Sequence, residues 1–212
     1  MSMIQNRKDL EFYISADRIM LGLPEKRGAK EIIFDMISNR GMIICYLLAM
    51  RKYAYYANVT RRGQFGRALF RLYWGRKFRK LGVKLGFSIG HNSIGYGVVI
   101  PHYGTIVING EARIGNFAVL HTCTCIAGKK EIGDYLYLST GSQITGDIIL
   151  GDGVTIAAHS LVNKSSEGYV LLAGSPAVEK RTNYPLWVER DGEVFAKRIE
   201  TVNLLKARIY NI

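Results

Sequence analysis

The chain has 212 residues, of which 48% are hydrophobic and 22% are charged, a composition that excludes an intrinsically disordered protein. Its net charge of +12 arises in residues 1–86, which hold 18 Lys or Arg against 6 Asp or Glu, whereas residues 87–212 hold 11 of each. The sequence therefore predicts two regions of different character.

The first 20 residues carry scattered charges and lack the uninterrupted apolar core of a secretory signal. The longest apolar run, residues 42–50, is about half of what a membrane-spanning helix needs. We therefore expect a cytoplasmic protein. The three cysteines, Cys45, Cys123 and Cys125, form no CxxC pair and have no histidines at zinc-finger spacing, so neither a disulfide framework nor a structural metal site is expected.

Residues 1–86 are predicted to form a helical, basic N-terminal region. Apolar residues recur there at three- and four-residue spacing, through Leu10, Ile14, Ile32, Ile33, Met36 and Ile37 and again over residues 43–56. No Asp or Glu occurs between Asp35 and Glu111, and over residues 51–84 basic and aromatic side chains alternate.

That basic and aromatic mixture has three interpretations: packing helices with solvated cations, a membrane-surface helix on anionic lipid, or a nucleic-acid surface. No nucleic-acid motif accompanies the charge, so a nucleic-acid partner is not expected. Packing is the plain alternative, and peripheral contact with the inner membrane surface through residues 51–84 stays open.

Residues 87–178 carry a six-residue repeat, which is the strongest signal in the sequence. Aliphatic residues recur at Ile94, Ile100 and Ile106 and, after a two-residue slip placed at Asn109–Gly110, at Ile114, Leu120, Ile126, Ile132, Leu138, Ile144, Leu150, Ile156 and Val162. A period of six fits neither a helix nor an ordinary strand, but it fits a short strand followed by a tight corner. Three such units close a coil of 18 residues with the aliphatic side chains inside.

The repeat therefore predicts a mainly β protein, a parallel β-helix of about four coils, followed by a C-terminal extension over residues 179–212. Gly and then Asn or Asp often follow the aliphatic residue, as at Gly115–Asn116, Gly133–Asp134 and Gly151–Asp152. These residue types tolerate the backbone angles of a corner. Handedness does not follow from the repeat, because parallel crossovers are nearly always right-handed and this class is an exception.

The stretch GFSIGHNSIGYGVVIPHYGTIVINGEARIGNFAVLHTCTCIAG, followed by IGDGVTIAAHSLVNKS and AGSPAV, resembles the serine O-acetyltransferase family of hexapeptide-repeat acyltransferases. It is especially similar to members associated with polysaccharide and capsule biosynthesis. The resemblance implies a left-handed β-helix and a homotrimer, with a dimer of trimers through the N-terminal helices as a further alternative. It also implies acetyl-CoA bound between neighbouring prisms, direct acetyl transfer to a hydroxyl, and no metal.

Within IPHYGTIVIN, His102 falls on the catalytic histidine of that family, and we expect it to be the general base. The chain departs from serine-specific members at the two positions where they place aspartates, which are Phe87 and Pro101 here. A long loop of those members is reduced to residues 128–131. The acceptor therefore stays open between L-serine, or a related small hydroxyl compound, and a sugar or polysaccharide precursor.

Folding the repeat into coils predicts which residues stack. His102 should lie in one column with Thr122, Thr140 and Ala158, small side chains that suit the pantetheine arm of coenzyme A. Neighbouring columns should hold Pro101, His121, Ser139 and Ala157 on one side and Tyr103, Cys123, Gly141 and His159 on the other. We expect Tyr103 and His121 to contact the acceptor, and the other predicted coenzyme contacts are Thr122, Ser139, Thr140, Gly141, Ala157, Ala158, His159, Lys164, Lys180 and Arg181, the last three at its phosphates.

Other functions compatible with a β-helix are a zinc carbonic anhydrase and a trimeric membrane-docking scaffold without catalysis. The anhydrase needs a close pair of histidines, which the spacings here do not supply. The scaffold predicts that His102 can be replaced without loss. Galactoside and xenobiotic acetyltransferases keep their histidine in a different repeat, near Thr140 and Gly141 here, so they match poorly.

Overall fold

The computed structural model describes residues 3–26, 28–30, 32–33, 38–61 and 63–211. Three long helices come first: α1 (Arg7–Met20), α3 (Asn39–Val59) and α4 (Phe65–Leu85). A stack of short strands follows, and the chain ends with α5 (Trp187–Arg190) and α6 (Glu193–Tyr210). The helices predicted around Leu10 and over residues 43–56 are confirmed as α1 and α3, while Met36 and Ile37 lie outside the described residues.

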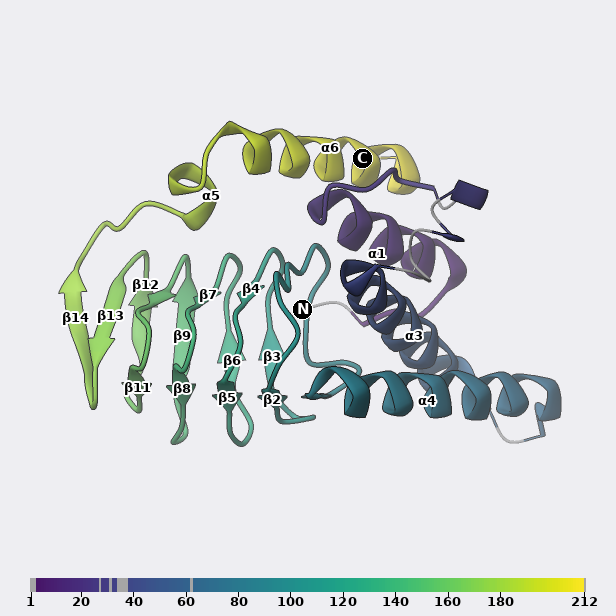
Figure 1. Ribbon diagram of the computed structural model, residues 1–212, viewed down its shortest axis with the longest axis horizontal. Helices are drawn as coiled ribbons and strands as arrows, with labels where there is room; N and C mark the ends of the chain where they lie inside the picture. Colours follow the sequence, from purple (N-terminus) through teal and green to yellow (C-terminus); the bar gives the residue numbers. More distant parts are fainter. Residues whose placement is uncertain (1–2, 27, 31, 34–37, 62, 212) are drawn as a thin grey trace.

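The strands form three sheets that make the faces of a prism (Figure 1). The first sheet has the order β1 (Phe87–Ile89), β2 (Ile106–Ile108), β5 (Thr124–Ile126), β8 (Gln143–Ile144), β11 (Leu161–Val162). The second has the order β3 (Arg113–Ile114), β6 (Glu131–Ile132), β9 (Ile149–Asp152), β12 (Ser166–Gly168). The third has the order β4 (Val119–Leu120), β7 (Tyr137–Leu138), β10 (Thr155–Ile156), β13 (Leu171–Gly174), β14 (Ala177–Arg181), and of its pairs only β13 with β14 is antiparallel.

The predicted parallel β-helix is therefore confirmed, with about five turns instead of four. The additional turn comes from strands that do not follow the six-residue spacing, β1 at the start and β12 and β13 at the end. All twelve aliphatic residues of the repeat are inside, each with an exposed fraction of 5% or less. Their burial removes apolar surface from water in every coil, which is the main stabilisation of such a stack.

The two-residue slip lies elsewhere than predicted. Val99 pairs with Val119, twenty residues on, whereas Ile106 pairs with Thr124, eighteen residues on. The two additional residues therefore lie between these positions, within residues 101–105, and not at Asn109–Gly110. Ile106 and Ile108 both face the core, at the two ends of β2. Either one can be counted as the aliphatic residue of the repeat, so the sequence alone does not show where the slip lies.

The glycines that follow the aliphatic residues are required by space, which differs from the reason predicted. A Cβ atom on Gly133 would lie 2.2 Å from Oδ1 of Asp152. That oxygen accepts a hydrogen bond from the Asp134 amide, at 2.7 Å, and Asp134 in turn accepts one from the Asn116 amide, at 2.8 Å. The Asn and Asp side chains thus link successive coils, and a glycine beneath each one leaves room for it.

The N-terminal helices cover the first coil through a buried ion pair. Arg51 on α3 donates to Asp17 on α1 at 2.8 Å and to the carbonyl oxygen of Ile94 at 2.8 Å. Asp17 also accepts hydrogen bonds from the amides of Gly97 and Val98. At the other end of the chain, α6 runs back over the prism to α1 (Figure 1). Among the described residues, no helix is long and apolar enough to cross a membrane.

Candidate active site

The corner where the third sheet turns into the first carries most of the predicted site residues, and we call it the site corner. It comprises residues 101–105, 121–123, 139–142 and 157–160, one segment from each of four successive coils. The Gly141 amide donates to the Thr122 carbonyl at 3.1 Å, and the His159 amide donates to the Thr140 carbonyl at 3.0 Å. These bonds confirm that residues 18 positions apart stack here.

The backbone turns through the left-handed region at the same position of three coils. The φ angles are 60° at Cys123, 75° at Gly141 and 56° at His159. A Cβ atom on Gly141 would lie 2.5 Å from the His159 ring, so the imidazole of His159 rests directly on Gly141. A residue with a side chain at position 141 would push this ring away.

His102 lies in the segment that holds the two additional residues. Gly104, with φ 141°, packs against Thr122, and the Thr124 amide donates to the Thr105 carbonyl. Gly104 therefore takes the place beside Thr122 that we predicted for His102. Residues 101–103 form an outward bulge next to His121, in which the His102 and Tyr103 side chains are exposed.

His121 is half-buried in the next coil, beside His102. Its Nε2 atom lies 3.0 Å from the hydroxyl of Tyr137, which projects from β7. Burial lowers the pKa of the His121 imidazole, the nearby His102 lowers it further, and the carboxylate of Asp191 opposes both. His121 is thus held in its neutral form near pH 7, and a neutral imidazole can accept a proton or a hydrogen bond.

Trp187 and Arg190 of the C-terminal extension lie beside Tyr137. The Arg190 guanidinium lies over the Tyr137 ring, 5.3 Å from its centroid, and donates to the Thr155 hydroxyl at 3.0 Å. Burial raises the pKa of the Tyr137 hydroxyl, so it keeps its proton at neutral pH. Buried Trp187 fixes this segment by donating from its indole N–H to the Phe117 carbonyl at 3.0 Å.

Sequence reasoning missed Tyr137 and Arg190. Tyr137 could have been found, because it stands in register with Val119 and Thr155 on the outer side of the third sheet. The residue before each inward aliphatic residue therefore also forms a column along the prism, as Val119, Tyr137 and Thr155 do. Arg190 lies outside the repeat, and no periodicity relates it to the site corner.

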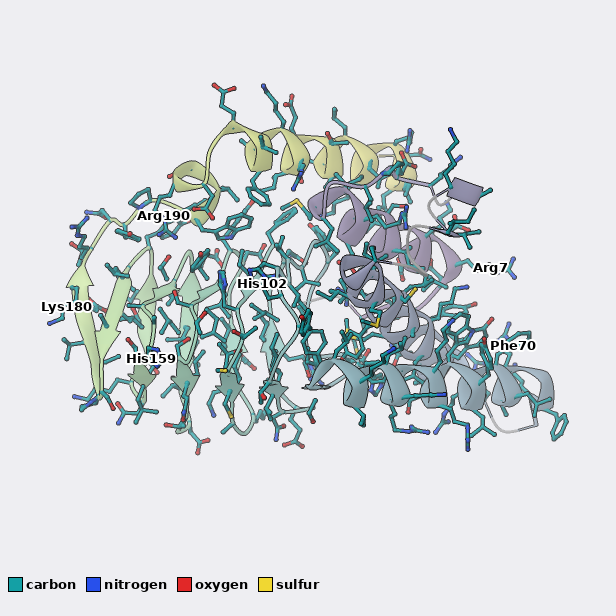
Figure 2. All side chains as sticks on the ribbon, in the orientation of Figure 1. Arg7, Phe70, His102, His159, Lys180 and Arg190 are labelled. Carbon is teal, nitrogen blue, oxygen red and sulfur yellow. The ribbon has the colours of Figure 1, made fainter. Side chains whose placement is uncertain are left out.

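The predicted coenzyme contacts divide into two groups. Small side chains at residues 122, 139–141 and 157–158 lie together at the site corner, with His159 beside them. Lys164 instead follows β11, at the corner between the first and second sheets, and Lys180 and Arg181 end β14. Figure 2 shows His102 toward the helical end of the prism, His159 farther along and Lys180 at the far end.

The two positions at which the chain departs from serine-specific enzymes differ in environment. Phe87 is buried, and its ring packs against Tyr46 with centroids 5.1 Å apart, whereas Pro101 is exposed beside His102. In the described part of the chain, no group of three or more His, Cys, Asp or Glu side chains is arranged to hold a metal ion.

These features define a parallel β-helix protein with helices at both ends of the chain and a histidine-bearing corner. No family model and no curated protein matches the sequence. Among solved structures, the chain is similar to a Neisseria gonorrhoeae serine acetyltransferase in complex with serine, with 18% identity and a TM-score of 0.57. The match covers 82% of this chain and 70% of that one.

A second similar structure is a serine acetyltransferase in complex with CoA, again with 18% identity. The match covers 82% of this chain and 85% of that one, with a TM-score of 0.50. At such identities the likeness establishes a shared fold. The particular reaction and acceptor of this chain are matters for proposal.

Proposed function

We propose that this chain is an acetyl-CoA-dependent O-acetyltransferase in which His102 is the general base. The observation that carries the proposal is the site corner, where an exposed imidazole begins a row of small side chains along the prism. The similar fold of a serine acetyltransferase with bound CoA supports the same coenzyme here.

In the proposed reaction, His102 removes the proton from the acceptor hydroxyl as its oxygen attacks the thioester carbonyl of acetyl-CoA. A C–O bond forms and a tetrahedral intermediate results. When the intermediate collapses, the C–S bond breaks and the protonated imidazole returns its proton to the departing thiolate. The products are the O-acetyl ester and free coenzyme A.

In this proposal, neutral His121 contacts the acceptor beside the base. Its link to the Tyr137 hydroxyl holds the ring orientation, and Arg190 in turn covers Tyr137. Tyr103, exposed on the same bulge as His102, would form another wall of the acceptor pocket. Coenzyme A would lie along residues 122, 139–141 and 157–159, with the phosphate contacts of Lys164, Lys180 and Arg181 as a further part of the proposal.

The acceptor is proposed to be a small hydroxyl compound, either L-serine or a sugar hydroxyl of a polysaccharide precursor. The solved serine complex of a similar fold favours serine. The absence of carboxylates at Phe87 and Pro101 favours a sugar, because a free amino acid presents an ammonium group that needs a counter-charge. We also propose a homotrimer, in which a neighbouring prism completes the coenzyme groove.

The test is a thiol-release assay with acetyl-CoA and a panel of L-serine, amino sugars and polysaccharide precursors. We expect His102→Ala to lower kcat by about 10²–10⁴-fold, which is the usual contribution of a general base. His91→Gln is the matched control and should leave kcat unchanged, because the His91 ring packs at a tilt against the Tyr53 ring, away from the site corner.

Wild-type turnover in His102→Ala would contradict the mechanism and favour a non-catalytic scaffold. If L-serine releases thiol as fast as the best sugar, the departures at Phe87 and Pro101 do not exclude serine. If none of the acceptors on the panel gives thiol release, the proposed acceptor class is contradicted.

A further inference from the structure

Helix α4 carries apolar side chains on a face that no described part of the chain covers. Phe65, Leu69, Leu72, Tyr73 and Val83 are between 52% and 86% exposed. Positions 65, 69, 72, 76, 80 and 83 follow one another at three- and four-residue spacing, so they lie on one face of the helix. We call this face the outer stripe; it comprises Phe65, Leu69, Leu72, Tyr73, Arg76, Lys80 and Val83.

The opposite face of α4 already provides the packing that the fold needs. Gly75, Phe78, Gly82 and Leu85 are its buried residues. A Cβ atom on Gly75 would lie 3.0 Å from the Tyr53 ring of α3, and one on Gly82 would lie 2.7 Å from the Phe87 carbonyl. These glycines let α4 approach its neighbours closely on this face. The apolar residues of the outer stripe lie on the other side of the helix and take no part in this packing.

The charge on α4 has a single sign. The helix contains no Asp or Glu, and its seven cations are Arg67, Arg71, Arg76, Lys77, Arg79, Lys80 and Lys84. Arg76 and Lys80 lie within the outer stripe. A two-fold contact between copies along this stripe would bring like charges together, which disfavours a second copy of the chain as its partner.

We propose that the outer stripe of α4 docks on the surface of an anionic lipid bilayer, with the helix lying in the plane of the interface. Helices that lie in this region carry aromatic and aliphatic side chains on one face and are rich in Lys and Arg, and α4 combines the exposed apolar groups of the outer stripe with seven cations. The apolar groups would enter the headgroup boundary, and the cations would meet the lipid phosphates. In Figure 1 the N-terminal end of α4 extends past α1 and α3.

Docking would also position the site corner. The Leu85 carbonyl at the end of α4 accepts a hydrogen bond from the Gly104 amide at 2.9 Å, two residues from His102. A 21-residue helix is about 32 Å long, so the His102 segment would lie within one helix length of the lipid contact. This inference goes beyond the proposed acetyl transfer and does not depend on it.

The test is co-sedimentation of the full chain with vesicles of phosphatidylcholine alone or mixed equally with phosphatidylglycerol. We expect binding to the mixed vesicles, weakened by added salt, and little binding to the neutral ones. Phe65→Ser/Leu69→Ser/Tyr73→Ser and, separately, Arg76→Gln/Lys80→Gln should each reduce partitioning by about tenfold or more.

The matched controls are Val194→Ser/Leu204→Ser, at exposed apolar positions of α6, and Lys8→Gln/Lys129→Gln, at exposed cations elsewhere. Both should bind as the wild type does. A milder variant, Phe65→Trp, keeps the stripe intact, and its added fluorescence should be quenched by brominated lipid, unlike that of Val194→Trp.

Three results would overturn the proposal: no binding to anionic vesicles, equal loss of binding in the control variants, or no difference in quenching between Phe65→Trp and Val194→Trp. Tighter binding to a DNA duplex than to the vesicles would assign the surface to nucleic acid. A change of oligomeric state in the stripe variants, measured by light scattering without lipid, would assign it to contacts between copies. None of these measurements needs acetyl-CoA or an acceptor, so their outcome is independent of the thiol-release assay.

Discussion

The imidazoles of His102 and His121 lie close together but in different environments. His102 is exposed on a bulge, whereas His121 is half-buried and contacts the Tyr137 hydroxyl. Because burial disfavours a charged ring, the pKa of His121 lies below its ordinary value of 6.5. His121 is therefore neutral near pH 7, which suits a neutral contact to the acceptor beside the proposed base.

Replacing charged neighbours should move the pKa of His121 in opposite directions. His102→Ala removes the neighbouring ring whose electrostatic effect lowers the pKa of His121, so that pKa should rise, whereas Asp191→Asn removes a negative charge and should lower it. Titration of the imidazole C–H resonances by NMR measures both. The pKa of His91, which is lowered by burial and by Arg113 and Arg71, serves as the unchanged reference.

The lowered pKa of His121 also makes the free energy of unfolding depend on pH. The unfolded chain binds a proton at His121 near pH 6.5, and the folded chain binds it only at lower pH. The free energy of unfolding contributed by this group is therefore fully present above about pH 6.5 and decreases as the pH falls toward the folded pKa. A His121 pKa at or above 6.5 would contradict the environment described here.

At the scale of elements, the ion pair between α1 and α3 joins the helices to the prism. The two side chains are almost completely buried and also bond to main-chain groups around residues 94–98. The first coil of a β-helix would otherwise end in unpaired backbone groups. The ion pair therefore provides hydrogen-bonding partners for main-chain groups of the first coil and also connects the two helices.

Removing one partner of this pair should be costly. Arg51→Met leaves Asp17 buried without its counter-charge, and we expect a loss of roughly 3–5 kcal/mol in the free energy of unfolding. Lys197→Met is the matched control, since Lys197 and Glu193 form an exposed pair one helical turn apart. That change should cost about 0.5 kcal/mol or less. Urea denaturation of both variants measures the difference, and equal losses would contradict this role of the pair.

At the scale of the whole molecule, helix α6 packs against helix α1. The Tyr210 hydroxyl on α6 donates to Asp9 on α1 at 2.8 Å, and Arg198 donates to the Met20 carbonyl at 3.0 Å. Trp187 anchors the same segment to the prism. Residues 182–211 therefore connect the third sheet to the helices and hold Arg190 over Tyr137.

Truncating the anchor should loosen this connection. Trp187→Ala should lower the free energy of unfolding by about 3–5 kcal/mol, because it empties a large buried site and leaves the Phe117 carbonyl unpaired. Hydrogen exchange should accelerate over α5, α6 and β7. Val194→Ala, at an exposed position of α6, should change neither quantity appreciably. Unchanged exchange in Trp187→Ala would mean that α6 is held by its contacts with α1 alone.

The sequence by itself determined the prism, the inward aliphatic residues and the stacking of residues 122, 140 and 158. It could do so because one backbone geometry recurs every 18 residues, so that residues 18 positions apart in the sequence are neighbours in adjacent coils. The left-handed sense of the helix, the predicted acetyltransferase activity and the predicted role of His102 rest on resemblance to a family.

Only the tertiary structure decided where the repeat is interrupted and what surrounds His121. The slip lies within residues 101–105. The sequence could not show this, because Ile106 and Ile108 both fit the inward position of the repeat. The contact of Arg190 with Tyr137 joins segments 53 positions apart with no shared period, and the exposure of the outer stripe depends on which side of α4 packs on α3. Such contacts depend on the packing of whole elements, which local residue patterns do not specify.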